Sequence, residues 1–150
     1  PLPDVVLCRC SGLQNTADVR AAYMDFRENL QDAMRIYPTR RSYTWGDIRF
    51  SGSCRLAVQG GEAALDACLD VIAPVQKDRE ELDLTETLSV YLLDGERSVT
   101  LTSQLLHLHK NTVKYRLHRI SDLLSHRVDK MPELLELYKA CAVRRLMSNK

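Results

Sequence analysis

A segment near the C-terminal end of the chain combines basic, amide and hydroxyl side chains at helical spacing. It runs from His109 to Arg119 with the sequence HKNTVKYRLHR. At about 100° of rotation per helical residue, one narrow stripe collects the apolar side chains Val113, Leu117, Ile120 and Leu124. The opposite side collects Asn111, Lys114, Tyr115, His118 and Arg119. Each of these polar side chains can reach a base edge or a phosphate, so the pattern predicts a helix that binds nucleic acid.

The first turn of this helix adds a second feature that attracts anions. His109, Lys110, Asn111 and Thr112 lie where free backbone N–H groups and the positive end of the helix dipole favour phosphate. We assign phosphate contacts to Thr112 and to four basic side chains, Lys110, Lys114, Arg116 and Arg119. We assign base contacts to Asn111, Lys114, Tyr115 and His118, because an amide can pair with adenine and an ammonium can reach guanine. Lys114 fits either role.

A shorter helix and a tight turn must hold the basic helix in place. Ser98 is a typical N-cap for a helix from about Val99 to Leu106. The turn at His107-Leu108 then leads to the long helix from Lys110 to Leu124, with small Ser103 allowing close approach of the two helices and Leu108 as an apolar plug. Two such helices, the second one basic, form a helix-turn-helix, which places its second helix in the major groove of DNA.

Further helices are predicted on both sides of this unit. Asp83 caps a helix that ends near Tyr91 or Leu93, before Asp94-Gly95. A helix from Glu62 to Ala73 is expected to end at Pro74. Pro132 opens a final helix, and the side chains expected to face inward from it are Leu135, Tyr138, Ala142 and Leu146.

The first part of the chain has a different pattern. Residues 5–10 read as a short strand, and a helix capped by Asn15 or Thr16 runs to a stop at Pro38. The apolar stripe of that helix consists of Val19, Ala22, Tyr23, Phe26, Leu30, Ala33, Met34 and Tyr37. Residues 40–50 are rich in aromatic and β-branched side chains and are expected to hold a second short strand. A strand-helix-strand unit of this size is typical of the tail end of a larger α/β domain.

The residues quoted above also resemble a known family. The stretch from Ser98 to Leu124 is similar to the helix-turn-helix of the PucR / CdaR-type bacterial transcription regulators, whose hallmark run corresponds to HKNTVKYRL at residues 109–117. The LTETL sequence at residues 84–88, followed by Tyr91-Leu92, looks like the helix that precedes that motif in the family. The resemblance covers about Asp83 to Met147. It implies a sequence-specific regulator that binds DNA as a dimer or larger oligomer and senses an effector through other regions.

The first part resembles the end of the degenerate GGDEF-like domain that precedes this module in the same family. The residues that carry this likeness lie between Gly12 and Asp47, with Tyr23, Arg27 and Glu28 among them. Ser103 departs from the alanine usual in the family, and His107 stands where the turn often has an aliphatic, aromatic or glycine residue. A serine is still small and a histidine in a turn can face solvent, so neither departure opposes the fold.

Charge is distributed unevenly although the formal net charge is only +1. From Glu62 to Glu96 there are ten acidic residues and two basic ones. From Arg97 to Ser121 there is no acid, and the basic residues are Arg97, Lys110, Lys114, Arg116 and Arg119. An acid-free basic stretch is the electrostatic footprint expected for a polyanionic partner, although such stretches are also common as solvated surface.

Composition excludes several classes of protein. The chain has 150 residues, of which 45% are hydrophobic and 27% charged, as in ordinary globular proteins. It has no apolar run long enough to cross a bilayer and no signal peptide, so we expect a cytoplasmic protein without membrane contact. Five cysteines, an odd number, favour reduced thiols. Because the sequence starts at Pro1, we expect it to be part of a longer protein.

Other functions are less consistent with the residues. An active cyclase would need an acidic and an aromatic residue after Gly60-Gly61-Glu62, where alanines stand instead, and no phosphate loop or zinc-protease helix is present. His107, His109 and His118 are candidate metal ligands, but a helix cap at His109 and a DNA contact at His118 are preferred. RNA modules stack bases on exposed aromatics, and the basic helix offers only Tyr115. A dimerisation module that binds DNA weakly or non-specifically remains the alternative.

The sequence therefore predicts a mainly α fold: a C-terminal helical bundle with a helix-turn-helix, preceded by a partial α/β segment. The expected organisation is the end of a GGDEF-like domain in residues 1–59, a helical linker in residues 60–82 and the helix-turn-helix domain in residues 83–150. The expected function is that of a sequence-specific transcription regulator, not an enzyme, with double-stranded DNA and a second copy of the chain as partners. We expect no cofactor and no metal, and a small-molecule effector sensed outside these residues.

Overall fold

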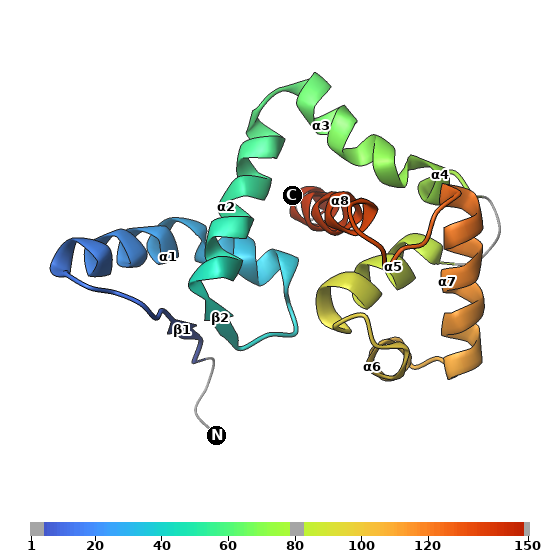
Figure 1. Ribbon diagram of the computed structural model, residues 1–150, viewed down its shortest axis with the longest axis horizontal. Coiled ribbons are helices and arrows are strands. Elements are labelled where there is room, and N and C mark those ends of the chain that lie inside the picture. The colour runs from blue at the N-terminus through green and yellow to red at the C-terminus, as the bar shows by residue number, and fades with distance from the viewer. Residues whose placement is uncertain (1–4, 79–82, 149–150) are drawn as a thin grey trace.

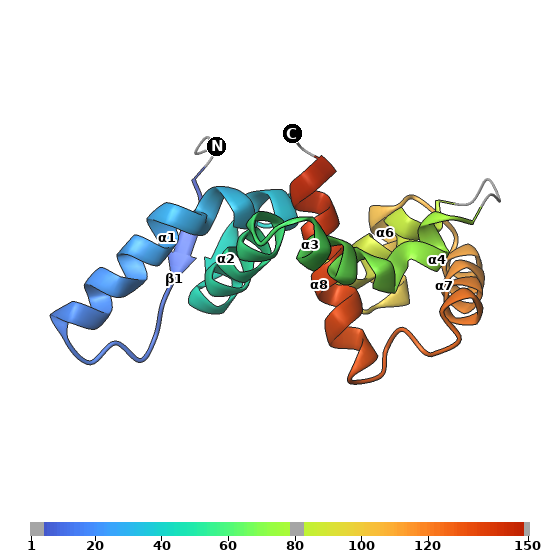
Figure 2. The same cartoon turned by 90° about the horizontal axis from the view of Figure 1, so that it is seen from above.

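The computed structural model describes residues 5–78 and 83–148. The molecule is elongated, with helix α1 (Thr16–Ile36) at one end and helix α7 (Lys110–Leu124) at the other (Figure 1). Helix α8 (Glu133–Ser148) runs between these two ends, as the view from above makes clear (Figure 2). None of the described helices is both long enough and apolar enough to cross a membrane. The fold is mainly α-helical, as predicted.

The only sheet in the described residues has two parallel strands near the N-terminus. Strand β1 (Leu7–Arg9) pairs with β2 (Ser42–Thr44), with Leu7 opposite Ser42. Helix α1 connects them, and its N-cap is Asn15, whose side chain accepts a hydrogen bond from the Asp18 amide. This strand-helix-strand unit agrees with the predicted partial α/β segment.

The short strand expected within residues 40–50 is confirmed as β2, but helix α2 (Trp45–Gln59), which begins directly after it, was not predicted. The helix begins with a capping box. The Asp47 amide donates to Thr44 Oγ1 at 3.2 Å, and the Thr44 amide donates to Asp47 Oδ2 at 2.8 Å. Because this reciprocal pair satisfies backbone groups at the helix start, it outweighs the β propensity of the flanking aromatic residues. The sequence TWGD carried this signal, since an acid three residues after threonine suits a capping box.

The chain is helical throughout residues 62–76, which follow α2. Helix α3 (Glu62–Leu69) starts after Gly61, whose φ of +96° is in the region that favours glycine. It continues into a 3₁₀ turn, η1 (Asp70–Ile72), and a short helix, α4 (Ala73–Gln76). Pro74 was expected to end a helix, but it lies in the first turn of α4. A proline is tolerated there, because an N–H in the first turn has no acceptor within the helix.

The C-terminal part contains the predicted helices with their predicted caps. Helix α5 (Leu84–Ser89) is capped by Asp83 and continues as a π-helical turn, η2 (Val90–Asp94). Ser98 caps helix α6 (Val99–Leu105). Between η2 and α6 the chain turns at Gly95, where a Cβ atom would collide with Thr102 Oγ1. Asp94-Gly95 therefore ends the helix as the sequence predicted, for a steric reason that only the packing reveals.

Helix α8 forms the centre of the hydrophobic core. Five residues in the middle of this helix are fully buried: Leu137, Ala140, Cys141, Ala142 and Val143. The helix packs against α1, α2 and α3 on one side and α5 and η2 on the other. Leu135 was expected to face inward but is 59% exposed, because it lies on the outer side of the first turn, before the helix enters the core.

A polar network joins the N-terminal helices to the C-terminal bundle. Arg145 of α8 pairs with Asp94 at 2.5 Å and also donates to the backbone carbonyl of Ile36 at 2.7 Å. The side chains of Arg145 and Asp94 are only 11% and 3% exposed. The hydroxyls of Tyr37 and Tyr138 are hydrogen-bonded at 2.8 Å. The three predicted segments thus share one continuous core, and the domain boundaries at residues 59 and 82 stay a prediction.

Removing the charge of Arg145 tests the importance of this junction. We expect Arg145→Ala to lower the free energy of unfolding by about 3–5 kcal/mol, because it leaves the buried Asp94 carboxylate without a charged partner. Arg144→Ala, a matched change at the half-buried neighbour on the same helix, should cost less than about 1 kcal/mol. Urea denaturation followed by circular dichroism measures both, and equal losses would contradict the assignment.

Candidate nucleic-acid interface

Helices α6 and α7 form a helix-turn-helix at the far end of the molecule from α1 (Figure 1). Thr102 and Ser103 of α6 are buried, as are Val113, Leu117 and Ile120 of α7. The amide of Leu108 donates to the Ser103 carbonyl at 2.9 Å, which closes the turn. Leu108 is partly buried against the core, as expected for an apolar plug. The apolar stripe of α7 therefore faces the core, and small Ser103 of α6 is buried in the helix-turn-helix, as the sequence predicted.

The turn depends on an unusual backbone conformation at His107. Its φ is +54°, in the left-handed region, and its side chain is exposed. Histidine is one of the residues that tolerate this region better than most, whereas β-branched residues do not. The turn therefore requires a residue that adopts positive φ at position 107, and it does not require the imidazole ring.

Two substitutions at His107 separate backbone from side chain. We expect His107→Gly to keep or raise stability, because glycine adopts positive φ without penalty. His107→Ile should be less stable than the glycine variant by about 1–2 kcal/mol, since a branched side chain is strained there and gains no burial. Midpoints of chemical denaturation measure the difference, and equal midpoints would show that the turn relaxes to another conformation.

The N-terminus of α7 is capped by His109, as predicted. Its Nδ1 atom accepts a hydrogen bond from the Asn111 amide at 3.2 Å, so the ring helps to define where the helix begins. His109, Lys110 and Asn111 are all exposed. The first turn thus presents a basic side chain, an amide and the positive end of the helix dipole to solvent together.

The structure divides the nine predicted site residues into two groups. Six have exposed side chains: His109, Lys110, Asn111, Lys114, Tyr115 and His118. Tyr115, at 57% exposed, is a large aromatic ring with no place in the core. Three are half-buried: Thr112, Arg116 and Arg119. Within this group, Asn111, Lys114, Tyr115 and His118 lie on the side of α7 opposite the buried Val113, Leu117 and Ile120.

Arg116 and Arg119 have partners within the chain. Arg116 donates to the buried hydroxyl of Thr87 on α5 at 3.0 Å. Arg119 pairs with Asp78, just beyond α4, at 3.5 Å. Both arginines therefore help to fix α7 against the helices behind it, and the phosphate contacts assigned to them from sequence stay a prediction.

A groove runs beside the second half of α7, and sequence reasoning missed it. Its volume is about 790 Å³. Lys114, His118, Ser121 and Asp122 form the wall on α7, Tyr91 and Leu117 are among the other lining residues, and the loop of residues 125–129 closes the other side. Burial raises the pKa of the Tyr91 hydroxyl. A sequence signal existed, because His126, Arg127 and Lys130 follow the basic helix closely, but nothing in the sequence placed them beside Lys114.

Acidic residues limit the basic surface at this end. Asp122 is exposed on α7, with a carboxylate oxygen 3.9 Å from His118 Nε2. Asp129 forms two hydrogen bonds with the Arg127 guanidinium, at 2.9 and 2.8 Å, and this pairing lowers the pKa of Asp129. Among the described residues, no group of three or more histidine, cysteine or acidic side chains is arranged to hold a metal ion. The first turns of α7 are thus the most favourable part for a polyanion.

These features define the class of protein domain: a helix-turn-helix whose second helix presents a polar and basic outer face, the arrangement of a DNA-binding module. Comparison with known proteins points to a family of this class. Residues 84–143 match the PucR C-terminal helix-turn-helix domain. The match begins with α5 and ends within α8, so it includes the helices that hold α6 and α7 in place.

A curated relative supports the same conclusion. The purine catabolism regulatory protein of Bacillus subtilis (strain 168) is 34% identical over 73 residues. Those residues are 49% of this chain but only 14% of the relative. No solved structure matches the chain. The matched family domain does not extend to residues 12–47, whose resemblance to a GGDEF-like domain stays a prediction.

Proposed function

We propose that this chain is the operator-binding part of a cytoplasmic transcription regulator and acts by sequence-specific binding to double-stranded DNA. The observation that carries the proposal is the outer face of α7, where six exposed side chains of the predicted site follow one another from the helix cap to His118. The domain family and the regulator that the chain resembles support it. Catalysis is no part of the proposed function.

The side chains divide the work by position along α7. Lys110 is in the first turn, next to the free N–H groups, and binds phosphate. Asn111 and Lys114 follow on the outer face and read base edges in the major groove, together with Tyr115 and His118. Asp122 lies on the same helix farther along, where its carboxylate faces the His118 ring at 3.9 Å. This gradient favours docking by the N-terminal half of α7, the half that enters the groove in helix-turn-helix proteins.

Two neighbouring substitutions test this division. In selection from a random duplex pool, Asn111→Ala should flatten the preference at one base position, a loss of about 1–3 kcal/mol of discrimination. Lys110→Ala is the matched control, because Lys110 is also exposed in the same turn and its loss should weaken binding to all sequences alike. Wild-type protein that enriches no motif would overturn the proposed function, as would Asn111→Ala that enriches the same motif as wild type.

We further propose that the chain binds as a homodimer, so that two copies of α7 read half-sites about 34 Å apart. The candidate contact is the exposed apolar side of α1, where Val19 and Tyr23 are 52% and 63% exposed. They line a groove of about 470 Å³ together with Phe26. Effector sensing belongs, in this proposal, to sequence outside these residues, as the family resemblance implies.

The double substitution Val19→Ser/Tyr23→Ser tests the dimer contact. We expect a shift toward monomer in sedimentation equilibrium and weaker binding to a palindromic site, with binding to a single half-site unchanged. Leu56→Ser, at another exposed apolar residue (69% exposed, on α2), is the matched control. A dimer that persists in the double variant would rule out this face.

A further inference from the structure

The groove between α7 and the loop that follows it includes residues to which the proposed base contacts assign no role, among them Arg127 and Asp129. Lys114 and His118 line the groove and also belong to the exposed face that we assign to DNA. The groove is therefore a lateral continuation of that face and not a separate cavity. A partner that lies in the groove against Lys114 and His118 also meets the loop of residues 125–129.

The loop is held in place by a buried side chain. Val128 is only 5% exposed and belongs to the hydrophobic core, whereas its neighbours Arg127 and Asp129 have side chains that are 68% and 36% exposed. Ser125, with φ of +59°, turns the chain at the end of α7. Anchoring by Val128 thus presents Arg127 at a defined position, which lowers the entropy cost of a contact there.

The pairing of Arg127 indicates what its guanidinium is arranged to bind. Its Nε and Nη2 atoms donate in parallel to the two carboxylate oxygens of Asp129. The same fork fits two phosphate oxygens. Since both side chains are accessible, the ion pair adds little stability, and a phosphate can replace Asp129 at low cost. Asp129 holds the guanidinium oriented until then.

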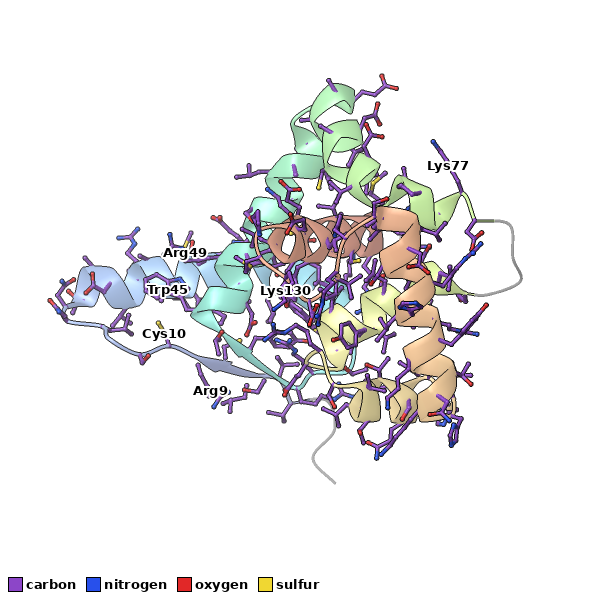
Figure 3. The ribbon with its side chains drawn as sticks, turned by 45° about the vertical axis from the view of Figure 1, so that its right-hand side comes forward. Arg9, Cys10, Trp45, Arg49, Lys77 and Lys130 are labelled. Carbon is purple, nitrogen blue, oxygen red and sulfur yellow. The ribbon has the colours of Figure 1, made fainter. Side chains whose placement is uncertain are left out.

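We propose that the loop of residues 125–130 is a second DNA-contacting element, in which Arg127 exchanges Asp129 for a backbone phosphate of the strand that lies in the groove beside α7. This inference rests on the proposed function, because α7 must bring the duplex to the groove. It adds a contact that carries no base information and fixes the angle of α7 in the major groove. Lys130, labelled in Figure 3, extends the basic character of the same loop.

The decisive comparison is between Asp129→Asn and the double variant Arg127→Ala/Asp129→Asn. A single Arg127→Ala change would expose the Asp129 charge and weaken DNA binding by repulsion alone. With Asn at position 129 that repulsion is absent, so the further loss on removing Arg127 reports its contact with DNA. Arg49→Ala is the control, since Arg49 is exposed on α2, on the other side of α8 from α7 (Figure 3).

Affinity for the selected operator is measured over a range of salt concentrations. We expect Asp129→Asn to bind more tightly than wild type, and the double variant to bind about tenfold more weakly than Asp129→Asn. For a dimer, the log–log salt slope of the double variant should be smaller in magnitude by about 2, the value for two lost phosphate contacts. Phosphate-ethylation interference should lose one position per half-site, next to the bases protected by α7.

The outcomes separate the two proposals. Equal affinity, salt slope and interference pattern for the two variants would overturn the loop contact while leaving the proposed function intact. A weaker double variant with an unchanged slope and pattern would also overturn it, because the effect would then be indirect. Wild-type protein without any sequence preference would instead be a failure of the proposed function. Thermal melting of each variant checks folding, and Arg127→Gln/Asp129→Asn replaces the double variant if that one melts early.

Discussion

The burial of helix α8 on nearly every side is the constraint on which the rest of the structure depends. The apolar residues in the middle of α8, from Leu137 to Val143, are enclosed by α1, α2 and α3 on one side and by α5 and η2 on the other. The C-terminal bundle and the N-terminal helices therefore cannot bury their apolar faces independently. The ion pair between Arg145 and Asp94 adds direction to this contact, because a buried charge requires a partner at one defined place.

The same packing explains how α7 is presented. Its apolar stripe rests on α5 and α6, and Arg116 and Arg119 bind Thr87 and Asp78 on the flank near α4 and α5. These contacts fix the rotation of α7 about its own axis. This rotation decides which side chains face a partner, because rotating the helix by about 100°, the angle between successive residues, would bring a different set of side chains to the outside. Arg116 and Arg119 thus hold α7 in the rotation that keeps its other polar side chains on the outside.

Much of the candidate site could be predicted from sequence because the signals are local. The bounds of α7, its apolar stripe, the caps at Asp83 and Ser98 and the cap at His109 all depend on residues within one or two helical turns. Helix α2 was missed although its capping box is equally local, because aromatic residues around Trp45 favoured a strand. Competing local signals are resolved by packing, and α2 lies against both α1 and α8.

By itself, the sequence predicted the bounds of α7, the periodicity of its apolar stripe and the resemblance of the C-terminal part to a PucR-type helix-turn-helix. Only the tertiary structure decided which basic residues point outward. Arg116 and Arg119 could not be separated from Lys110 and Lys114 by type or spacing, because their partners are 29 and 41 residues away in the chain. Tertiary packing also places the loop of residues 125–129 beside Lys114 and leaves Leu135 exposed. Contacts between distant segments depend on how helices pack, and helical periodicity reports only which face of each helix is apolar.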